Sequence, residues 1–363
     1  VVNGAAIRAF TTAEGTRRRQ IYWAAVLYNA LQLFGFKYLG FFVGSFGALF
    51  STDLPELRFL IPLGISFWTL QLIAYLTDVY FKRAEPEARW LNLSLFVAFF
   101  PHVVSGPIPR GREMFPQFAE ARTLTAGHIA EGAKVLFGGY ILKFFIADVL
   151  AEHVVNPVFA APGDYSMIGH WLGILGYCGQ VFGDFAGYSI MAIGIGRLFG
   201  ITVPINFNYP FFSKNMMEFW RRWHITLNTW LFDYLYRPLT TSHSWFRGRL
   251  DLCFLVVFAV SGLWHGATWA FVFWGALHGV GLIVHRRWDE AYRGLCRKDR
   301  VWVTRRKTRS YSAFSWTVTQ LFFVLTLVPF RSPDAGAAVS YFGAMFTGAG
   351  LHHPFGGNPL GFL

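Results

Sequence analysis

Long apolar runs, separated by short loops rich in lysine and arginine, constrain this chain more than any other feature. Several of these runs approach or exceed the ~20 residues that an α-helix needs to cross a bilayer. Of the 363 residues, 54% are hydrophobic and only 14% are charged. These properties predict an all-α, polytopic integral membrane protein, a multi-span bundle of helices. The apolar segments cover residues 21–50, 59–81, 90–104, 132–150, 167–201, 251–284 and 313–330, with a weaker one at 339–346.

The net charge of +12 gathers beside the apolar segments, at Arg17–Arg19, at Lys82 and Arg83, and across residues 286–309. Nucleic acid is one possible partner of a basic chain. Basic loops that flank membrane segments are instead typical of the cytoplasmic side of a membrane protein. The two crossings at 21–50 and 59–81 place the loops at Arg17 and Lys82 on the same side. We therefore expect these loops and residues 286–309 in the cytoplasm, a lipid bilayer around the chain, and no nucleic-acid partner.

The organisation of the chain is that of one membrane domain over residues 1–363, because neither a repeat nor a low-complexity linker is visible. The segments 167–201 and 251–284 exceed a single crossing, so they either tilt strongly or break into hairpins, and the glycines within them favour breaks. The sequence has no initiating methionine, and we expect its native start to be missing. Three scattered cysteines do not predict a disulfide framework.

Residues 101–118, PHVVSGPIPRGREMFPQF, form the first polar interruption. Pro101, Pro107 and Pro109 preclude a continuous helix, because proline lacks a backbone N–H and clashes with the preceding turn. Irregular backbone at membrane depth persists only where protein or water satisfies its polar groups. The segment is either a re-entrant or interfacial loop or a plain surface connection.

The second interruption, GQVFGDFAGYS, places Gln180, Asp184 and Tyr188 at intervals of four residues, and therefore near one face of a helix. An acidic residue in a spanning segment costs about 2.5 to 3.5 kcal/mol and marks a candidate functional site. The alternative is that Asp184 only neutralises a basic side chain of another helix, with Arg221 and Arg222 as available partners.

The third interruption is EFWRRWHITLNTW, residues 218–230. Asn215 and Glu218 have the spacing of a capping box, which predicts a helix start there. The tryptophans that follow recur at helical spacing, and His224 shares their apolar face. Arg221 and Arg222 flank that face, so we expect an amphipathic helix at the membrane interface or beside an aqueous cavity. Taken alone, His224 is either a hydrogen-bonded structural histidine or a catalytic one.

The fourth interruption, SGLWHGATW, places His265 within a long apolar segment, between Gly262 and Gly266. Small residues let helices approach closely, so we expect His265 in the protein interior. A histidine there can be a structural donor, a metal ligand or a proton-transfer group. His265, His278 and His285 lie thirteen and seven positions apart, which does not match a helical ligand pair, and we predict no metal site.

Together these motifs resemble the membrane-bound O-acyltransferase superfamily. The similarity rests on FWRRWHITLNTWLFDYLYRPL, SGLWHGATWAFVFWGALHG, IPLGISFWTLQLIAYLTDVYF, SGPIPR and GDFAGYSIMAIGIGRLFG, in the family's order, and it covers residues 61–280. Within the superfamily the chain is most similar to the bacterial alginate O-acetylation membrane protein and its relatives in polysaccharide and teichoic-acid acylation.

The resemblance implies an enzyme that moves an acyl group, most often acetyl, from a cytoplasmic thioester to a hydroxyl acceptor. His265 matches the family's catalytic histidine, which would act as a general base, and His224 matches its second histidine. Binding and positioning roles would fall to a larger group, namely Trp220, Arg221, Arg222, Trp223, Trp264, Asp184, Asp233 and Arg237.

The same resemblance implies acyl-CoA, above all acetyl-CoA, or an acyl-carrier thioester as donor, with no resident cofactor. The acceptor would be an extracytoplasmic polysaccharide, reached through a periplasmic or extracellular acyltransferase partner. The expected location is the bacterial inner (plasma) membrane.

Two departures from the family pattern concern the acceptor side: Phe232 stands where the family commonly has arginine, and Arg237–Thr241 replaces a glycine-containing loop. Alternatives therefore stay open, namely transfer of D-alanyl or another acyl group to a cell-wall polymer or a lipid, and a non-catalytic transporter or scaffold.

Overall fold

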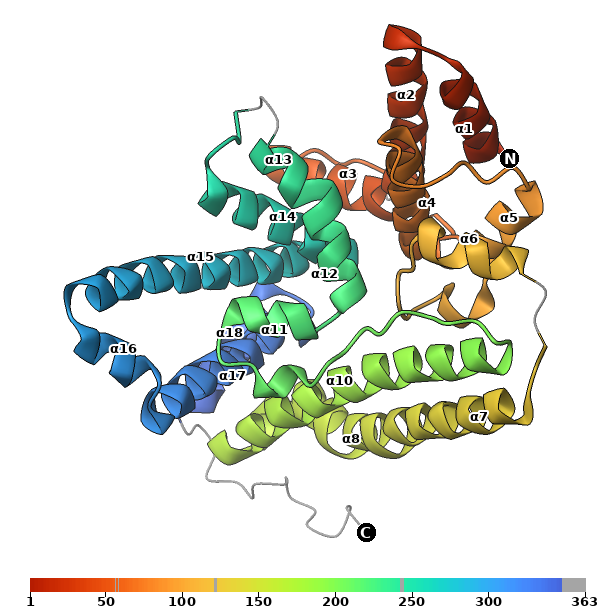
Figure 1. Cartoon of the computed structure of the whole chain (residues 1–363). Helices are drawn as coiled ribbons and strands as arrows, with labels where there is room; N and C mark the ends of the chain where they lie inside the picture. Colours follow the sequence, from red (N-terminus) through yellow and green to blue (C-terminus); the bar gives the residue numbers. More distant parts are fainter. Residues whose placement is uncertain (56, 58, 121–122, 242–244, 348–363) are drawn as a thin grey trace. The chain divides into compact units, whose positions relative to one another are not determined.

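The computed structural model of the chain describes residues 1–55, 57, 59–120, 123–241 and 245–347 (Figure 1). Within these residues the regular structure is helical and contains no strand, as expected for an all-α protein. Contacts divide the chain into two compact units, Val1–Gly138 with Tyr188–Ile205, and Gly139–Gly187 with Asn206–Leu363. The assignment of residues 1–363 to a single domain stays a prediction, and residues 348–363 lie outside the described part.

The first unit is built on a buried aromatic core. Its helices are α1 (Val2–Thr12), α2 (Gly15–Leu33), η1 (Phe34–Tyr38), α3 (Leu39–Phe50), α4 (Ile65–Tyr80), α5 (Trp90–Ala98), η2 (Phe100–His102), α6 (Gly111–Ala119) and most of α7 (Ala126–Tyr140). Phe10, Tyr75, Phe96 and Met114 bring α1, α4, α5 and α6 together. Such aromatic contacts add about 0.5–1.5 kcal/mol per pair beyond simple burial.

The proline-rich stretch 101–118 is buried over most of residues 101–111 and partly exposed beyond them. His102 has no exposed surface, and its Nδ1 lies 3.0 Å from Nε2 of Gln71 on α4. Ile108 and Arg110 are also buried, before α6 begins at Gly111. The stretch is therefore not a plain surface connection, because protein groups surround its irregular backbone.

Two helices among the described residues, Gly15–Phe50 and Arg309–Arg331, are long and apolar enough to cross a membrane. The predicted span 59–81 is shorter than expected, since α4 begins only at Ile65. Pro62 and Gly64, whose φ is +71°, delay the helix start. The apolar helices Trp90–His102 and Leu250–His265 are likewise shorter than a full span.

The second unit carries every residue discussed below as a candidate site. Its helices are η3 (Ile141–Ala147), α8 (Asp148–Leu150), η4 (Ala151–Val155), α9 (Asn156–Ala160), η5 (Pro162–Asp164), most of α10 (Met167–Leu198), η6 (Pro210–Phe212), α11 (Met216–Arg222), α12 (Ile225–Leu231), η7 (Phe232–Tyr236), α13 (Arg237–Thr241), α14 (Leu250–His265), α15 (Trp269–Lys298), α16 (Arg300–Arg306), α17 (Arg309–Arg331) and α18 (Ala335–Thr347).

Helix α10 corrects one expectation, because its 32 residues form a single unbroken helix rather than a hairpin. At a rise of 1.5 Å per residue it is roughly 48 Å long. Its glycines serve packing instead of bending: a Cβ at Gly183 would lie 3.0 Å from Ala147 Cβ, and one at Gly187 would lie 2.9 Å from the Gly139 carbonyl oxygen. These glycines therefore permit the close approach of neighbouring backbone and do not break the helix.

The segment 251–284 does break, as predicted, into the hairpin of α14 and α15 (Figure 1). The two helices touch backbone to backbone: a Cβ at Gly262 would lie 2.0 Å from the Phe271 carbonyl oxygen, and one at Gly275 would lie 2.1 Å from that of Phe258. This contact fixes the end of α14, where His265 is the last helical residue.

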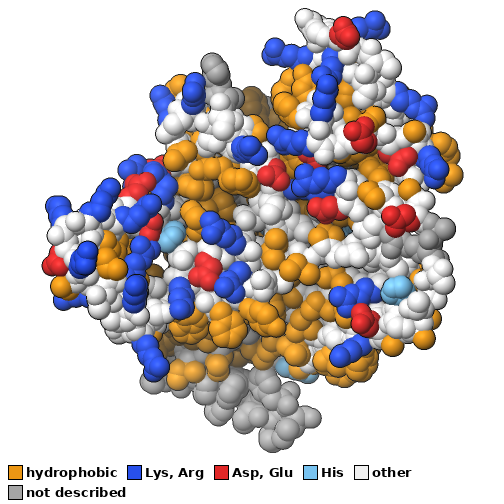
Figure 2. Space-filling view, in the orientation of Figure 1, with side chains coloured by type: hydrophobic (Ala, Val, Ile, Leu, Met, Phe, Trp, Pro, Cys, Tyr) orange, Lys and Arg blue, Asp and Glu red, His pale blue; other side chains and the backbone are white. Residues whose placement is uncertain are grey.

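The basic segment 286–309 is held by ion pairs between neighbouring helices. Asp251 at the start of α14 binds Arg286 and Arg287 of α15, and Asp289 of α15 binds Arg306 of α16. Figure 2 shows Lys and Arg side chains gathered over α16 and the adjoining ends of α15 and α17. The expected cytoplasmic loop is therefore a folded, positively charged cap.

Candidate active site

A sharp turn between two short helices determines the backbone conformation and surroundings of His224. Asn215 caps α11 as predicted, because its side chain accepts a hydrogen bond of 2.8 Å from the Glu218 N–H. The continuous helix expected beyond it is wrong: α11 ends at Arg222, and α12 begins at Ile225. His224 lies between them in the left-handed region, with φ 44° and ψ 53°. Non-glycine residues in that region cluster at functional sites, because the strain must be held by surrounding structure.

The extended segment of residues 206–208 supplies that surrounding structure. The Asn208 N–H donates to the Arg222 carbonyl oxygen at 2.9 Å, and the Ile225 N–H donates to the Asn206 carbonyl oxygen at 2.9 Å. These two bonds satisfy backbone groups that the helix break would otherwise leave unpaired. The segment therefore holds Trp223 and His224 in place from both sides.

The Asn206 side chain determines which nitrogen of His224 carries hydrogen. Its Oδ1 accepts from the Thr226 N–H at 3.2 Å and the Thr226 hydroxyl at 2.9 Å, and it lies 3.1 Å from His224 Nδ1. A backbone N–H only donates, so the atom at this position is the amide oxygen. Neutral His224 must therefore carry its hydrogen on Nδ1. Its Nε2 keeps a lone pair and has no hydrogen-bond partner among the described residues.

His265 faces His224 from the end of α14. The two ring centroids are 6.4 Å apart, with an angle of 66° between the ring planes, so the imidazoles meet edge to face. Trp264 borders both rings, at 6.0 Å from His224 and 5.0 Å from His265. Trp274 and Phe330 enclose the other side of His265, at 5.2 and 5.7 Å. The structure thus brings together the two histidines that the sequence singled out, which lie 41 positions apart.

Buried polar atoms without partners surround this pair. Such atoms are rare, because an unsatisfied buried donor or acceptor costs about 1–3 kcal/mol. Within the described residues they include Trp220 Nε1, His224 Nε2, Ser261 Oγ, Trp274 Nε1 and His278 Nδ1. Other such atoms, for example His102 Nε2 and Gln180 Oε1, lie elsewhere, and those near the two imidazoles can bind a polar ligand.

His278 is a residue that sequence reasoning considered only as a metal ligand and then set aside. It is fully buried on α15, 4.7 Å from the Trp274 ring and 5.1 Å from the Trp220 ring. The Thr326 hydroxyl donates to the Phe323 carbonyl oxygen at 2.7 Å, so it accepts from Nε2 of His278 at 3.0 Å. Trp274 and His278 are four residues apart on one apolar helix, and this spacing places both side chains on the same face. It is the sequence signal by which the buried position of His278 could have been predicted.

Asn206 carried no comparable signal. It lies in INFNYP, a short polar stretch between two helices, where nothing in the sequence distinguishes it from Asn208. Asn206 is 1% exposed, whereas Asn208 is exposed. Only the folded chain shows which of the two asparagines faces His224.

Trp220 and Trp223 are both buried, on opposite sides of the break between α11 and α12. Trp223 stacks on Phe219 at 5.6 Å and contacts Phe323 at 5.1 Å, on one side of the break. Trp220 lies on the other side, 4.9 Å from Phe258, and separates the buried His278 from a cavity.

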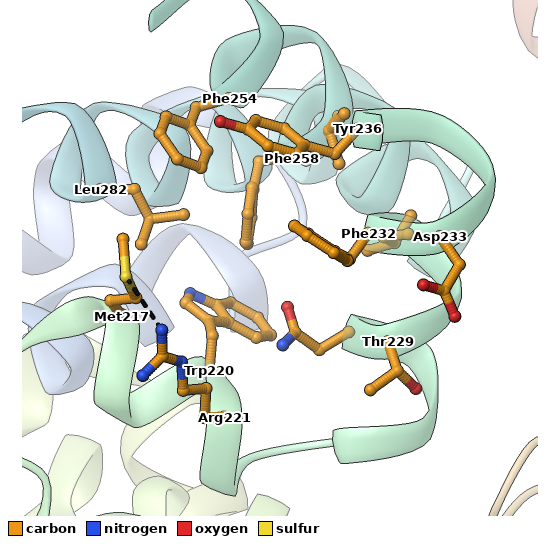
Figure 3. A pocket seen from close by; sticks show the side chains of 13 residues that line it. Met217, Trp220, Arg221, Thr229, Phe232, Asp233, Tyr236, Phe254, Phe258 and Leu282 are labelled. Atoms are coloured by element: carbon orange, nitrogen blue, oxygen red, sulfur yellow. Dashed lines mark hydrogen bonds between the residues drawn. The ribbon is translucent and has the colours of Figure 1, made fainter. Parts of the chain in front are cut away.

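That cavity has a volume of about 470 Å³ and is bounded by α11, α12, η7, α14 and α15 (Figure 3). Its walls are mostly aromatic, with Phe232, Tyr236, Phe254 and Phe258 opposite Trp220. Arg221 stands at its edge, 3.5 Å from the Met217 sulfur. In Figure 3 the Asp233 carboxylate points away from the centre of the cavity.

The other charged residues of the predicted site lie elsewhere. Arg222 pairs with Glu218 at 2.8 Å, within α11. Asp184 of α10 pairs with Lys143 of η3 at 2.6 Å, so it does neutralise a basic side chain of another helix, but that partner is neither Arg221 nor Arg222. The reason is topological: η3 packs beside α10 and supplies Lys143 locally, which also binds Asp148. Arg237 is exposed at the start of α13 and lines neither this cavity nor the histidine pair.

Among the described residues, no three His, Cys, Asp or Glu side chains are placed so that they could bind one metal ion together.

Comparison with known proteins agrees with the arrangement. The model of the membrane-bound O-acyltransferase family matches residues 87–328, more than half of the chain and all of the histidine site. The chain belongs to the membrane-bound O-acyltransferase family. The protein is thereby membrane-bound, and the resemblance inferred from the motifs is confirmed.

Three relatives show the range of this family branch. A probable alginate O-acetylase of Azotobacter vinelandii is 38% identical over 86% of this chain and 60% of its own length. A peptidoglycan O-acetyltransferase of Helicobacter pylori is 34% identical over 96% of this chain and 69% of its own. A teichoic acid D-alanyltransferase of Bacillus subtilis is 32% identical over 64% and 62%. The chain thus spans about 60 to 70% of the length of these curated relatives.

Proposed function

We propose that this chain is the acyl-transferring part of a multi-pass membrane enzyme of the bacterial inner membrane. It moves an acyl group, above all acetyl, from a cytoplasmic thioester to a hydroxyl acceptor that belongs to an extracytoplasmic polysaccharide. The observation that carries the proposal is the facing pair His224 and His265, 6.4 Å apart among unpartnered buried polar atoms. The names of the relatives, two of them O-acetylating enzymes, support acetyl over other acyl groups.

In this proposal His265 is the general base. It takes the proton of the acceptor hydroxyl as the oxygen attacks the thioester carbonyl carbon. The tetrahedral intermediate then collapses, the carbon–sulfur bond breaks, and the imidazolium returns the proton to the departing thiolate. The products are an ester and a free thiol, so atoms and charge balance. General-base assistance of this kind contributes roughly 10²- to 10⁴-fold.

His224 positions the acceptor. With its hydrogen on Nδ1 and held by Asn206, its free Nε2 can accept a hydrogen bond from a hydroxyl but cannot donate one to an oxyanion. Stabilising the negative oxygen of the intermediate then falls to N–H donors, and the unpartnered indole of Trp274 beside His265 is suited to it.

The donor reaches the site through the aromatic cavity of Figure 3. Its apolar walls suit the pantetheine arm and acyl group that acyl-CoA and acyl-carrier donors share, and Arg221 at its edge suits a phosphate. The extracytoplasmic partner that would pass the acyl group on, and the polysaccharide itself, rest on family resemblance.

The test is acyl transfer in reconstituted vesicles, with labelled acetyl-CoA supplied on the cytoplasmic side. His265→Ala should lose at least about 100-fold in thioester cleavage and transfer, since it removes the base. His153→Ala, an exposed histidine of η4, is the matched control and should keep the wild-type rate. Full activity in His265→Ala would contradict the mechanism. A non-catalytic scaffold or transporter would then be the better functional assignment.

The same vesicles separate the possible acyl groups. A chain that cleaves a D-alanyl carrier thioester but not acetyl-CoA would retain the histidine chemistry and change the donor, in line with the teichoic acid relative.

A further inference from the structure

A second cavity, of about 810 Å³, opens between α15 and α17 and is separate from the proposed acyl-transfer site. Leu282 of α15 lines the first cavity, whereas Val280 and Val284 line the second, so the two cavities use different faces of that helix. We call the second cavity the α15–α17 groove.

The walls of the groove are two apolar rails. Val280, Val284 and Trp288 follow one another at intervals of four residues along α15, and Phe314, Val318 and Phe322 do the same along α17. These side chains are largely exposed, with 61% of Val284 and 64% of Phe314 accessible. Within the described part of the chain, α17 is one of two helices long and apolar enough to cross a membrane, and its exposed apolar side chains suit contact with hydrocarbon. An occupant of the groove must therefore carry hydrocarbon itself.

Basic side chains line the groove. They are Lys214, which precedes α11, and Arg306 and Lys307 at the end of α16. Asp289 binds Arg306, but neither the Lys214 nor the Lys307 ammonium has a carboxylate partner among the described residues. The only acidic side chain lining the groove in that part of the chain, Glu218, is bound to Arg222. The groove therefore carries positive charge that no lining carboxylate neutralises in the described part of the chain.

An aromatic pair marks the level where the apolar rails meet the charges. The Trp288 indole N–H donates to the Tyr311 hydroxyl at 3.1 Å, across the groove from α15 to α17. Tryptophan and tyrosine gather where hydrocarbon gives way to head groups, because their rings are amphipathic. The groove thus has the profile of a membrane leaflet: hydrocarbon, an aromatic boundary, then cations.

We propose that the α15–α17 groove is a binding site for an anionic phospholipid of the cytoplasmic leaflet. Its phosphate and anionic head group bind Lys214 and Lys307, with Arg306 held in register by Asp289, and its proximal acyl chain lies between the two rails. Charge complementarity selects an anionic over a zwitterionic lipid, because basic pockets between membrane helices attract anionic head groups. The bound lipid also joins α11, α15 and α17, and of these α15 and α17 contribute Trp274 and Phe330 beside His265.

Native mass spectrometry of the detergent-solubilised protein tests the proposal, with phosphatidylglycerol and phosphatidylcholine of identical chains. Wild type should bind phosphatidylglycerol at least about tenfold more tightly. Lys214→Gln/Lys307→Gln should reduce that preference to near parity. The control Arg297→Gln/Lys298→Gln removes the same charge from the same basic segment, outside the groove, and should leave the preference unchanged.

Two further arms keep the proposal falsifiable. Val318→Trp fills the space between the rails but keeps every charge, and it should weaken phosphatidylglycerol binding as well. Excess soluble coenzyme A should not displace the lipid. Equal loss in the control pair would reduce the effect to general surface charge, and displacement by coenzyme A would make the groove a nucleotide site; either result overturns the proposal.

Discussion

At the scale of the residue, the site depends on contacts between side chains distant in sequence. The apolar position of His224 was predicted from helical spacing, and its burial, with 1% of its surface exposed, agrees. Its left-handed backbone and its bond to Asn206 were not predicted. Helical periodicity assigns a residue to a face, but it carries no information on where the helix stops or which loop packs against the gap.

Asn206→Ala is the first prediction at this scale. It removes the acceptor for His224 Nδ1 and for Thr226, so the His224 ring should lose its fixed orientation. We expect the acyl-transfer rate to fall by about tenfold to a hundredfold, as for other misaligned reacting groups. Asn208→Ala keeps the backbone bonds of the same segment and should retain the wild-type rate. Rates are compared at equal amounts of folded protein, and equal rates in both variants would refute the positioning role.

At the scale of the element, the α14–α15 hairpin is the contact on which the position of His265 depends. Glycine spacing predicted close helix packing here, and the backbone contacts of Gly262 and Gly275 confirm it. The same kind of spacing in α10 did not produce the expected break. A glycine permits both a bend and a close neighbour, and the neighbour decides which one occurs.

Gly275→Ala should therefore lower stability by about 1–3 kcal/mol, the usual cost of overpacking. Its new methyl would meet the Phe258 carbonyl oxygen of α14, and the hairpin would have to open. Gly294→Ala is the control on the same helix, because a Cβ there meets nothing within 4 Å. Thermal unfolding in detergent should show a lower transition temperature for Gly275→Ala alone, and unchanged unfolding of that variant would contradict the tight contact.

The junction of α15 and α16 gives a pH-dependent prediction. Burial alone would raise the pKa of Asp289, but the hydrogen bond and charge of Arg306, with Arg293, lower the pKa below its ordinary value. A depressed carboxyl pKa stabilises the fold above the ordinary value of about 4, and this stability is lost as the pH falls through the lowered pKa.

Asp289→Asn should accordingly reduce the transition temperature at neutral pH and have progressively less effect below about pH 4. The expected loss is modest, below about 1 kcal/mol, because the pair lies near the surface. Unfolding curves of wild type and variant across pH provide the measurement. A difference that persists or grows in acid would rule out the ion pair as its source.

At the scale of the whole molecule, orientation in the membrane follows from the distribution of charge. By the positive-inside rule we expect the positively charged cap formed by α16 and the ends of α15 and α17 on the cytoplasmic side (Figure 2). Two helices qualify as spans on length and apolarity among the described residues, so a multi-pass topology stays a prediction.

Cys296 provides a native probe of that orientation. It lies in the basic cap and is partly exposed, whereas Cys178 and Cys253 are buried. A membrane-impermeant maleimide should label sealed vesicles only when it is added on the cytoplasmic side. Cys296→Ser should abolish the labelling, and reaction from the opposite side would invert the proposed topology.

The sequence by itself determined the helical membrane class, the family, the two histidines and the hairpin that presents His265. These features depend on composition, spacing and local backbone chemistry, which a linear pattern records directly. Only the tertiary structure decided the left-handed turn at His224, the choice of Asn206 over Asn208, the pairing of Asp184 with Lys143, and the groove between α15 and α17. Each of these depends on which distant segment packs against a residue, and packing is settled by the free energy of the whole fold.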